Sequence, residues 1–204
     1  MKLQAIALNG SLKAADAEET SSTDRMIGVI GDELAKHGVA LGETIRLASR
    51  NILPGVSSDE GPGDDWPDVR RRILAADLLI FGTPIWLGQM SSVAKRALER
   101  MDAFLGETDD QGRMPSFSKV AVAAIVGNED GAHSVTASLF QALNDVGWTI
   151  PAGGACYWVG EAMHGTDFKE LPQVPPKVAE TSAMLASNAA HLARLLKAER
   201  YPGT

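Results

Sequence analysis

Residues 120–131 read Val-Ala-Val-Ala-Ala-Ile-Val-Gly-Asn-Glu-Asp-Gly, an apolar run that ends in a polar turn. The run has the length of a strand and no polar face, so it predicts a strand that is buried on both sides. A helical pattern follows over 132–146 and stops at Gly147. A buried strand that passes directly into a helix is the unit from which parallel sheets are built.

The same alternation of apolar runs and helical patterns continues along the chain. Five strands that alternate with helices predict right-handed crossovers and a parallel sheet covered on both faces, an α/β three-layer sandwich in a single domain over 1–204. The other expected strands are 3–8, 39–47 (the weakest), 78–81, and a fifth that begins near 149 and includes 155–159; the other expected helices are 23–37, 68–76, 91–105 and about 176–198, and 48–67 is expected to be a loop.

The composition favours a globular protein that does not bind nucleic acid. The 204 residues are 45% hydrophobic, which is enough to fill one sizeable core. The formal charge of -7 argues against a nucleic-acid partner, which needs a basic stripe. The densest basic group, Arg70-Arg71-Arg72, stands beside acidic residues, so we expect a solvated helix face with local ion pairs.

Two further features bear on the cellular compartment. No apolar run approaches the ~20 residues that span a bilayer, and the N-terminal run stops at Asn9-Gly10 without a cleavage site, so we expect a strand there and not a signal peptide. The single cysteine, Cys156, cannot form an internal disulfide or hold a metal cluster alone. We therefore expect a cytoplasmic protein without a membrane partner or a bound metal.

Ligands of such sheets bind outside the carboxyl ends of the strands, where the strand order reverses. The loop after the first strand crowds hydrogen-bond donors ahead of a helix, where free N–H groups and the helix dipole favour a phosphate. Ordinary helix capping is the alternative. The chain has neither a Gly-Lys-Ser/Thr phosphate loop nor a G-x-G-x-x-G motif, which argues against nucleoside triphosphates and directly bound dinucleotides. The donors are Ser11, Lys13, Ser21, Ser22 and Thr23.

Two more strand-end loops stand out. The loop 82–92 holds Trp86 between apolar residues. A tryptophan is usually core or an interface anchor, but apolar side chains and exposed N–H groups at a strand end also suit a flat heteroaromatic ring. The loop 127–133 by itself predicts only a turn and a helix start, and we expect His133 to be exposed. Glu129 and Asp130 are not an acid–base pair, because adjacent side chains rarely point at one reacting bond.

Together these loops resemble those of a known family. The stretches LNGSLK (8–13), SST (21–23), GTPIWLGQMSSVAKRALERMD (82–102) and VGNEDGAH (126–133) are similar to the NADPH-dependent FMN reductase branch of the flavodoxin-like superfamily, over roughly residues 1–165. The resemblance implies a flavodoxin-like sheet in the order 2-1-3-4-5, FMN as the cofactor, and NADPH or NADH as the electron donor. The stretch between Ser11 and Ser21 is longer than the family's compact loop.

The resemblance also implies roles for particular residues. The five donors of the first loop would hold the FMN phosphate, and the stretch 157–168 would flank the pocket. Six residues would line the isoalloxazine ring, namely Pro84, Ile85, Trp86, Leu87, Gly88 and Gln89. Six more would close its other edge, namely Gly127, Asn128, Glu129, Asp130, Gly131 and His133.

The implied function is an FMN-dependent oxidoreductase that passes electrons from NAD(P)H to a small acceptor such as a quinone or free flavin. Flavin carries this chemistry without a side-chain acid or base, so we name no catalytic residue. Trp86 with Trp158 or Phe168 would supply an aromatic wall for the nicotinamide. Two alternatives stay open, a flavodoxin-type electron carrier and a regulatory protein of this fold without flavin. Trp86 also predicts a homo-oligomer, a dimer or tetramer, with its loop near the interface.

Overall fold

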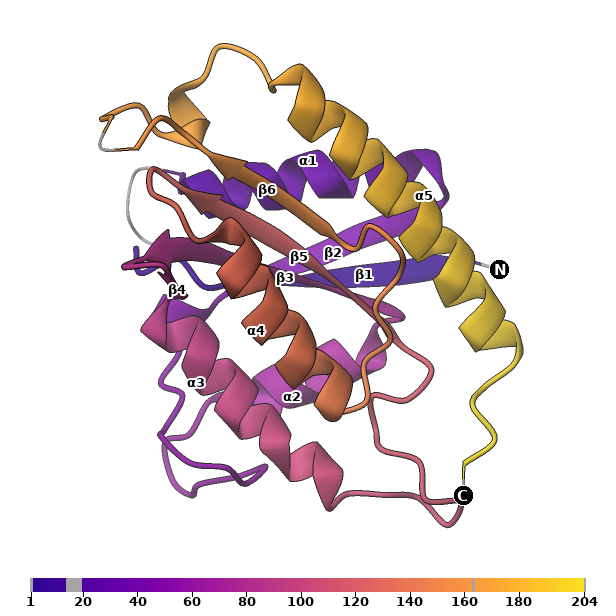
Figure 1. The fold of residues 1–204 in the computed structure, drawn as a ribbon. Coiled ribbons are helices and arrows are strands. Elements are labelled where there is room, and N and C mark those ends of the chain that lie inside the picture. Colours follow the sequence, from indigo (N-terminus) through magenta and orange to yellow (C-terminus); the bar gives the residue numbers. More distant parts are fainter. Residues whose placement is uncertain (1, 14–19, 163, 204) are drawn as a thin grey trace.

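A parallel sheet forms the middle layer of the molecule (Figure 1). The computed structural model describes residues 2–13, 20–162 and 164–203, and within them five parallel strands lie in the order β2-β1-β3-β5-β6. Counted along the chain this is 2-1-3-4-5, so the predicted flavodoxin-like fold is confirmed. The strands are β1 (Leu3–Asn9), β2 (Val39–Arg46), β3 (Leu78–Trp86), β5 (Val120–Gly127) and β6 (Ala155–Val159), and the short β4 (Gln89–Met90) pairs antiparallel with the end of β3.

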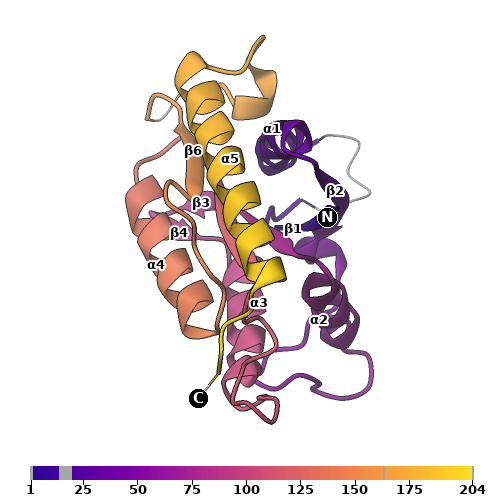
Figure 2. The ribbon, with the colours of Figure 1, turned by 90° about the vertical axis from the view of Figure 1, so that its right-hand side faces the viewer.

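Helices cover both faces of the sheet (Figures 1 and 2). On one face lie α1 (Ser22–Lys36) and α5 (Pro176–Ala198). On the other face lie α2 (Trp66–Ala75), α3 (Ser92–Met101) and α4 (Ala132–Asp145). Three short 3-10 turns complete the described elements, η1 (Leu47–Ser49), η2 (Asp102–Leu105) and η3 (Phe168–Glu170).

The side chains of β1 show why both faces are covered. Successive residues of a strand point to opposite sides of the sheet. Leu3, Ala5 and Ala7 enter the core beneath α1 and α5, whereas Ile6 and Leu8 enter the core beneath α2, α3 and α4. All five are at most 6% exposed. A strand with two apolar faces is stable only between two layers.

The loop predicted over 48–67 ends earlier than expected. α2 begins at Trp66 and not at Asp68, and Pro67 stands in its first turn, where a missing N–H costs nothing. The Trp66 ring is fully buried, and the guanidinium of Arg100 lies 5.9 Å from its centre. The helix start is thus set by a tertiary contact that no local pattern shows.

Two predicted strands also have different limits. β6 begins at Ala155, and Thr149 makes only an isolated bridge to Val120. β3 does not stop at Phe81 but continues to Trp86 and turns back into β4. It is longer because β5 and then β4 supply hydrogen-bonding partners beyond the apolar run. Half of the predicted second loop is therefore a β-hairpin.

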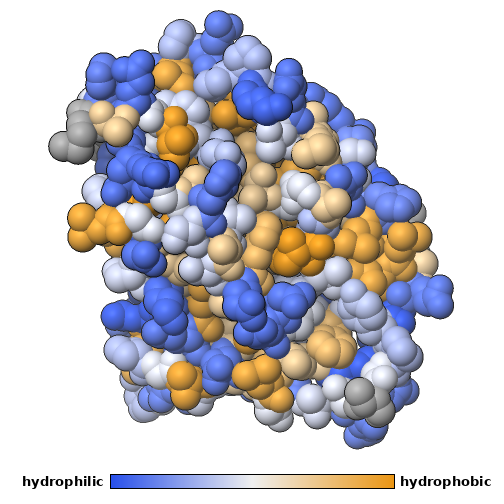
Figure 3. Space-filling model, in the orientation of Figure 1, coloured by the Kyte–Doolittle hydropathy of each residue, from blue (hydrophilic) through white to orange (hydrophobic). Residues whose placement is uncertain are grey.

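Hydrophilic and apolar residues are interspersed on the face of the molecule shown in Figure 3. The basic group on α2 makes the expected ion pairs, because Arg71 and Arg72 contact Asp68 and Arg72 also contacts Glu43. Among the described residues, none of the helices is both long and apolar enough to cross a bilayer.

Candidate functional site

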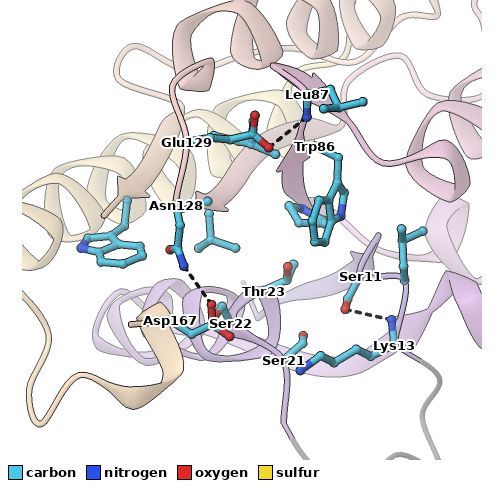
Figure 4. Close-up of a pocket in the computed structure, with 16 residues that line it drawn as sticks. Ser11, Lys13, Ser21, Ser22, Thr23, Trp86, Leu87, Asn128, Glu129 and Asp167 are labelled. Atoms are coloured by element: carbon cyan, nitrogen blue, oxygen red, sulfur yellow. Dashed lines mark hydrogen bonds between the residues drawn. The ribbon is translucent and has the colours of Figure 1, made fainter. Parts of the chain in front are cut away.

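The carboxyl ends of β1, β3 and β5 open onto a cleft with a volume of about 610 Å³. β1 pairs with β2 on one side and with β3 on the other, so the cleft lies where the strand order reverses. Its walls come from the three strand-end loops and from the segment that follows β6 (Figure 4). The lining residues are Ser11, Leu12, Lys13, Ser21, Ser22, Thr23, Pro84, Ile85, Trp86, Leu87, Val126, Gly127, Asn128, Glu129, Trp158 and Asp167.

The polar wall of the cleft is the start of α1, which Ser21 caps. The Ser21 hydroxyl oxygen accepts the Asp24 N–H at 3.1 Å, and the Asp24 carboxylate accepts the Ser21 N–H at 3.0 Å, which makes a capping box. The first backbone bond of the helix runs from the Arg25 N–H to the Ser21 carbonyl. The N–H groups of Ser22 and Thr23 therefore stand at the cleft end of α1 without an intrahelical acceptor.

An ion pair that the sequence analysis did not predict lies behind this helix end. Arg46, the last residue of β2, contacts the Asp24 carboxylate and donates a hydrogen bond to the Lys13 carbonyl at 2.7 Å. Burial raises the pKa of Asp24, but the hydrogen bonds from Ser21 and the Arg46 charge outweigh it and hold this pKa below its usual value. The pair joins the first loop to α1 and β2, and its two charges offset one another.

Hydrogen bonds between backbone groups and side chains hold the first loop as far as Lys13. The Ser11 N–H donates to Asn9 Oδ1 at 2.8 Å, and the Lys13 N–H donates to the Ser11 hydroxyl oxygen at 3.2 Å. The Ser91 hydroxyl, which also caps α3, donates to the Gly10 carbonyl at 2.6 Å. The second loop thus holds the first. Residues 14–19 lie outside the described part of the chain, so the expected long first loop is described only at its ends.

The apolar wall of the cleft is the hairpin of β3 and β4. Leu87 and Gly88 form its two-residue turn with φ of 53° and 73°, the positive values that a type I′ turn needs. Trp86 is 54% exposed and points into the cleft (Figure 4), so it is not a core residue. Gly88 and Gln89 belong to the hairpin but do not line the cleft.

The third loop contacts the walls on both of its sides. The Glu129 carboxylate accepts hydrogen bonds from the N–H groups of Leu87 and Gly88 at 2.9 and 3.2 Å. Asn128 turns the other way, and its amide donates to Asp167 Oδ1 at 3.2 Å (Figure 4). One loop therefore connects the hairpin to the segment after β6.

Three residues expected at the cofactor's other edge lie outside the cleft. His133 is exposed, and its Nε2 lies 3.0 Å from the Tyr157 hydroxyl oxygen. Asp130 accepts the Gly131 N–H at 2.7 Å. Gly131 packs against the backbone of Gly88. None of these three residues lines the cleft.

The end of β6 and the segment after it form the remaining wall. The expected place of the stretch 157–168 beside the pocket holds for Trp158, in β6, and for Asp167, since both line the cleft. Phe168 does not, because its ring is fully buried, 5.5 Å from the Trp158 ring and beneath the Arg25 guanidinium. Of the two alternatives for an aromatic wall beside Trp86, Trp158 lines the cleft and Phe168 does not, because the Phe168 ring completes the core between α1 and β6. Arg25 also donates to the Phe168 carbonyl at 2.7 Å, which ties the segment to α1.

Some residues of the site carry no signal in the sequence. Leu12 and Val126 are direct neighbours of predicted residues, so they are found by extending the loops by one position. Arg46 contacts the first loop only because of the fold, and no local pattern marks it. Asp167 belongs to the stretch 157–168, which the family resemblance had placed beside the pocket.

Comparison with known proteins shows the family to which the chain belongs. The model of the family described as NADPH-dependent FMN reductase matches residues 2–163. The chain belongs to this family. As a member of the NADPH-dependent FMN reductase family, it is a flavin-dependent oxidoreductase with the flavodoxin-like fold.

Two curated relatives and one solved structure align with nearly the whole of this chain. An 8-demethyl-8-aminoriboflavin-5'-phosphate synthase of Streptomyces davaonensis is 29% identical over 213 residues, covering 98% of this chain and 81% of the relative. A divalent metal cation transporter MntH of Mycobacterium bovis is 31% identical over 203 residues, covering 96% of this chain but 29% of the transporter. The likeness to the transporter therefore concerns a minor part of it.

The solved structure is a crystal structure of RosB with its bound intermediate, 8-demethyl-8-formylriboflavin-5'-phosphate. It superposes on this chain with a TM-score of 0.86 at 27% sequence identity, covering 98% of this chain and 82% of RosB.

Proposed function

We propose that this oxidoreductase binds FMN in the cleft and passes electrons from NADPH or NADH to a small acceptor such as a quinone or free flavin. The observation that carries the proposal is the union of a polar helix end and an aromatic wall in one cleft. A flavin phosphate needs both, because its phosphate is anionic and its ring is flat and largely apolar.

The start of α1 is the proposed phosphate end. The Ser22 and Thr23 N–H groups lack intrahelical acceptors, and the helix dipole adds partial positive charge there. The side chains of Ser11, Lys13 and Thr23 line the same end. The Ser11 oxygen accepts the Lys13 N–H, and its hydroxyl proton is still available to a phosphate oxygen. Ser21 contributes as the cap that shapes this end.

The hairpin and the third loop form the proposed ring end. Pro84, Ile85, Trp86 and Leu87 line one side of the cleft, and Gly127, Asn128 and Glu129 line the other. Hydride transfer would need one face of the ring to be accessible, because the nicotinamide must stack on the flavin at roughly 3–3.5 Å.

FMN, when bound, supplies the redox chemistry by accepting a hydride and passing the electrons to an acceptor. The tasks of the chain itself are to bind the phosphate, to hold the ring against Trp86 and to leave one face accessible. These tasks need no side-chain acid or base, and we assign no catalytic residue.

Stopped-flow absorbance tests the proposal. The FMN-loaded protein is mixed with NADH or NADPH without oxygen, and bleaching of the flavin is followed before turnover with a benzoquinone. Reduction faster than that of free FMN supports a reductase. If neither nicotinamide achieves this, the reductase proposal fails and the flavodoxin-type carrier replaces it. A protein that takes up no FMN supports the flavin-free regulatory alternative.

A second candidate function treats the flavin as substrate. It is favoured by RosB, whose structure holds an 8-formyl flavin phosphate, and by the Streptomyces relative, which is named as a synthase of the 8-amino compound. Replacing the 8-methyl group by an amino group would oxidise the methyl carbon to the formyl level and then to a carboxylate, which would leave as CO2 as the amino group takes its place. It therefore requires an oxidant such as oxygen and an amine donor. The test is therefore incubation with FMN, oxygen and an amino acid, followed by mass spectrometry. An unchanged flavin mass rejects this candidate.

A further inference from the structure

Every second residue of the third loop, from Gly127 through Glu129 to Gly131, contacts the hairpin of β3 and β4. A Cβ on Gly127 would lie 2.9 Å from Ile85 Cβ, and a Cβ on Gly131 would lie 2.9 Å from Gly88 Cα. Between these two glycines, Glu129 accepts the two N–H groups of the turn. The glycines allow the two backbones to meet, and the carboxylate bonds them together.

The turn that Glu129 holds is not favoured by its own sequence. Leu87 has a φ of 53°, a left-handed conformation that a residue with a Cβ rarely adopts. Two-residue turns of this type usually read Asn-Gly or Gly-Gly. The Leu87 side chain is 92% exposed, so its packing does not hold the turn. The hydrogen bonds to the Glu129 carboxylate take over this task.

We propose that Glu129 is a positioning residue that fixes the hairpin turn and thereby holds the Trp86 ring as a wall of the cleft. The inference rests on the proposed function, because the flavin ring would stack on that wall. Trp86 directly precedes the turn, so a displacement of Leu87 and Gly88 moves its ring. Glu129 also occupies both turn N–H groups, which are then not offered to the flavin.

The charge of Glu129 has a second effect, because the residue lines the cleft. A carboxylate beside the flavin ring disfavours the arrival of negative charge on that ring. Glu129 therefore lowers the reduction potential of the bound flavin. Asn128 does not share this role, because its side chain is neutral and turned toward Asp167.

The first experiment measures amide hydrogen exchange of Leu87 and Gly88 in the flavin-free protein. Glu129→Ala removes both acceptors, so exchange at these two amides should be about tenfold faster than in the wild type. Glu129→Gln keeps one acceptor, so its exchange rates should lie between those of the wild type and those of Glu129→Ala. Glu180→Gln, on the exposed surface of α5, removes the same charge far from the turn and should change nothing. Unchanged exchange in Glu129→Ala overturns the proposal.

A variant that relieves the strain in the turn distinguishes an effect of Glu129 on the turn from a general loss of structure. Leu87→Gly removes the unfavourable left-handed conformation, so the turn depends less on its anchor. Glu129→Gln should therefore accelerate exchange less in the Leu87→Gly background than in the wild type. An equal acceleration in both backgrounds overturns the proposal. This pair carries the test if circular dichroism shows that Glu129→Ala does not fold.

The second experiment uses the FMN-loaded protein. Glu129→Gln should raise the reduction potential of the flavin and weaken FMN binding by about tenfold, whereas Glu180→Gln should match the wild type. If exchange changes while the potential and affinity do not, Glu129 holds the turn without positioning the cleft, and the proposal is overturned. A wild type that takes up no FMN overturns the proposed function instead, and the exchange result still reports on the turn.

Discussion

Thr23 is the residue at which the proposed hydrogen bond to the FMN phosphate is measured most directly. Its side chain lines the cleft and is 1% exposed. Thr23→Val keeps the shape and removes the hydroxyl, so we expect FMN affinity to fall by about tenfold, or ~1.5 kcal/mol, in a fluorescence titration. Ser138→Ala, which removes a hydroxyl on α4 bonded to the Ser134 carbonyl, is the control. Unchanged affinity in Thr23→Val and Ser11→Ala together would place the phosphate elsewhere.

Cys156 provides a second prediction at the scale of one residue. Burial raises the pKa of its thiol to about 12, and the side chain is fully buried. Because the thiolate is the reactive form, we expect the native protein not to react with the thiol reagent DTNB at mildly alkaline pH. One thiol per chain should react after denaturation. Rapid reaction of the folded protein would show that Cys156 is accessible and contradict the prediction.

At the scale of an element, the start of α1 depends on its cap. Ser21→Ala breaks the capping box, so the free energy of unfolding should fall by about 1 kcal/mol in a urea titration. Ser138→Ala is the matched control, because the exposed Ser138 hydroxyl bonds the Ser134 carbonyl within α4 and does not cap a helix. We also expect Ser21→Ala to weaken FMN less than Thr23→Val does. An equal loss of stability in Ser21→Ala and Ser138→Ala would argue against the cap.

The segment between η1 and α2 depends on a buried ion pair. Arg100 and Asp64 lie 2.6 Å apart with both side chains fully buried. Arg100 also donates to the carbonyls of Leu53 and Ser57, so it anchors the segment to α3. Asp64→Asn leaves the Arg100 charge unpaired, and we expect the free energy of unfolding to fall by about 3–5 kcal/mol. A loss no larger than that of Asp68→Asn, on an exposed ion pair, would contradict this role.

The same pair predicts a dependence of stability on pH. Burial raises the pKa of Asp64, but the hydrogen bonds from Arg100 and the backbone outweigh it, so this pKa lies well below its usual value. A carboxyl with a lowered folded-state pKa stabilises the protein above its unfolded-state pKa and loses this effect as the pH falls. The stability difference between wild type and Asp64→Asn should therefore shrink below about pH 4. A difference that stays constant with pH would contradict the assignment.

At the scale of the whole molecule, exposed apolar side chains gather at the mouth of the cleft. Leu12, Trp86 and Leu87 are 50%, 54% and 92% exposed, and all three line the cleft. We propose a homo-oligomer, a dimer or tetramer, with the hairpin near its interface, because association would cover this area. Leu87→Asp should lower the mass seen by light scattering, whereas Leu195→Asp on α5 should not. A wild-type monomer at micromolar concentration would contradict the proposal.

The sequence by itself determined the fold class and the edge of the sheet that holds the cleft. Both follow from local properties, because an apolar run such as 120–126 marks a buried strand by its own residues. Alternation with helices then requires a parallel sheet, and a parallel sheet collects its strand ends along one edge. Local sequence also indicated the hydroxyls and Trp86, since the hydroxyls stand at the start of the helix that follows β1 and Trp86 is the last residue of β3.

Only the tertiary structure decided which side chains meet at that edge. Glu129 bonds a turn that lies 42 residues earlier in the chain. Arg46 reaches Asp24 across 22 residues, and Phe168 completes the core. The end of β3 forms a hairpin because it pairs with β4. The hairpin forms although Leu87 in its turn has an unfavourable positive φ. Such contacts depend on how the crossover connections bring distant segments together. They cannot be predicted from the spacing of neighbouring residues in the sequence.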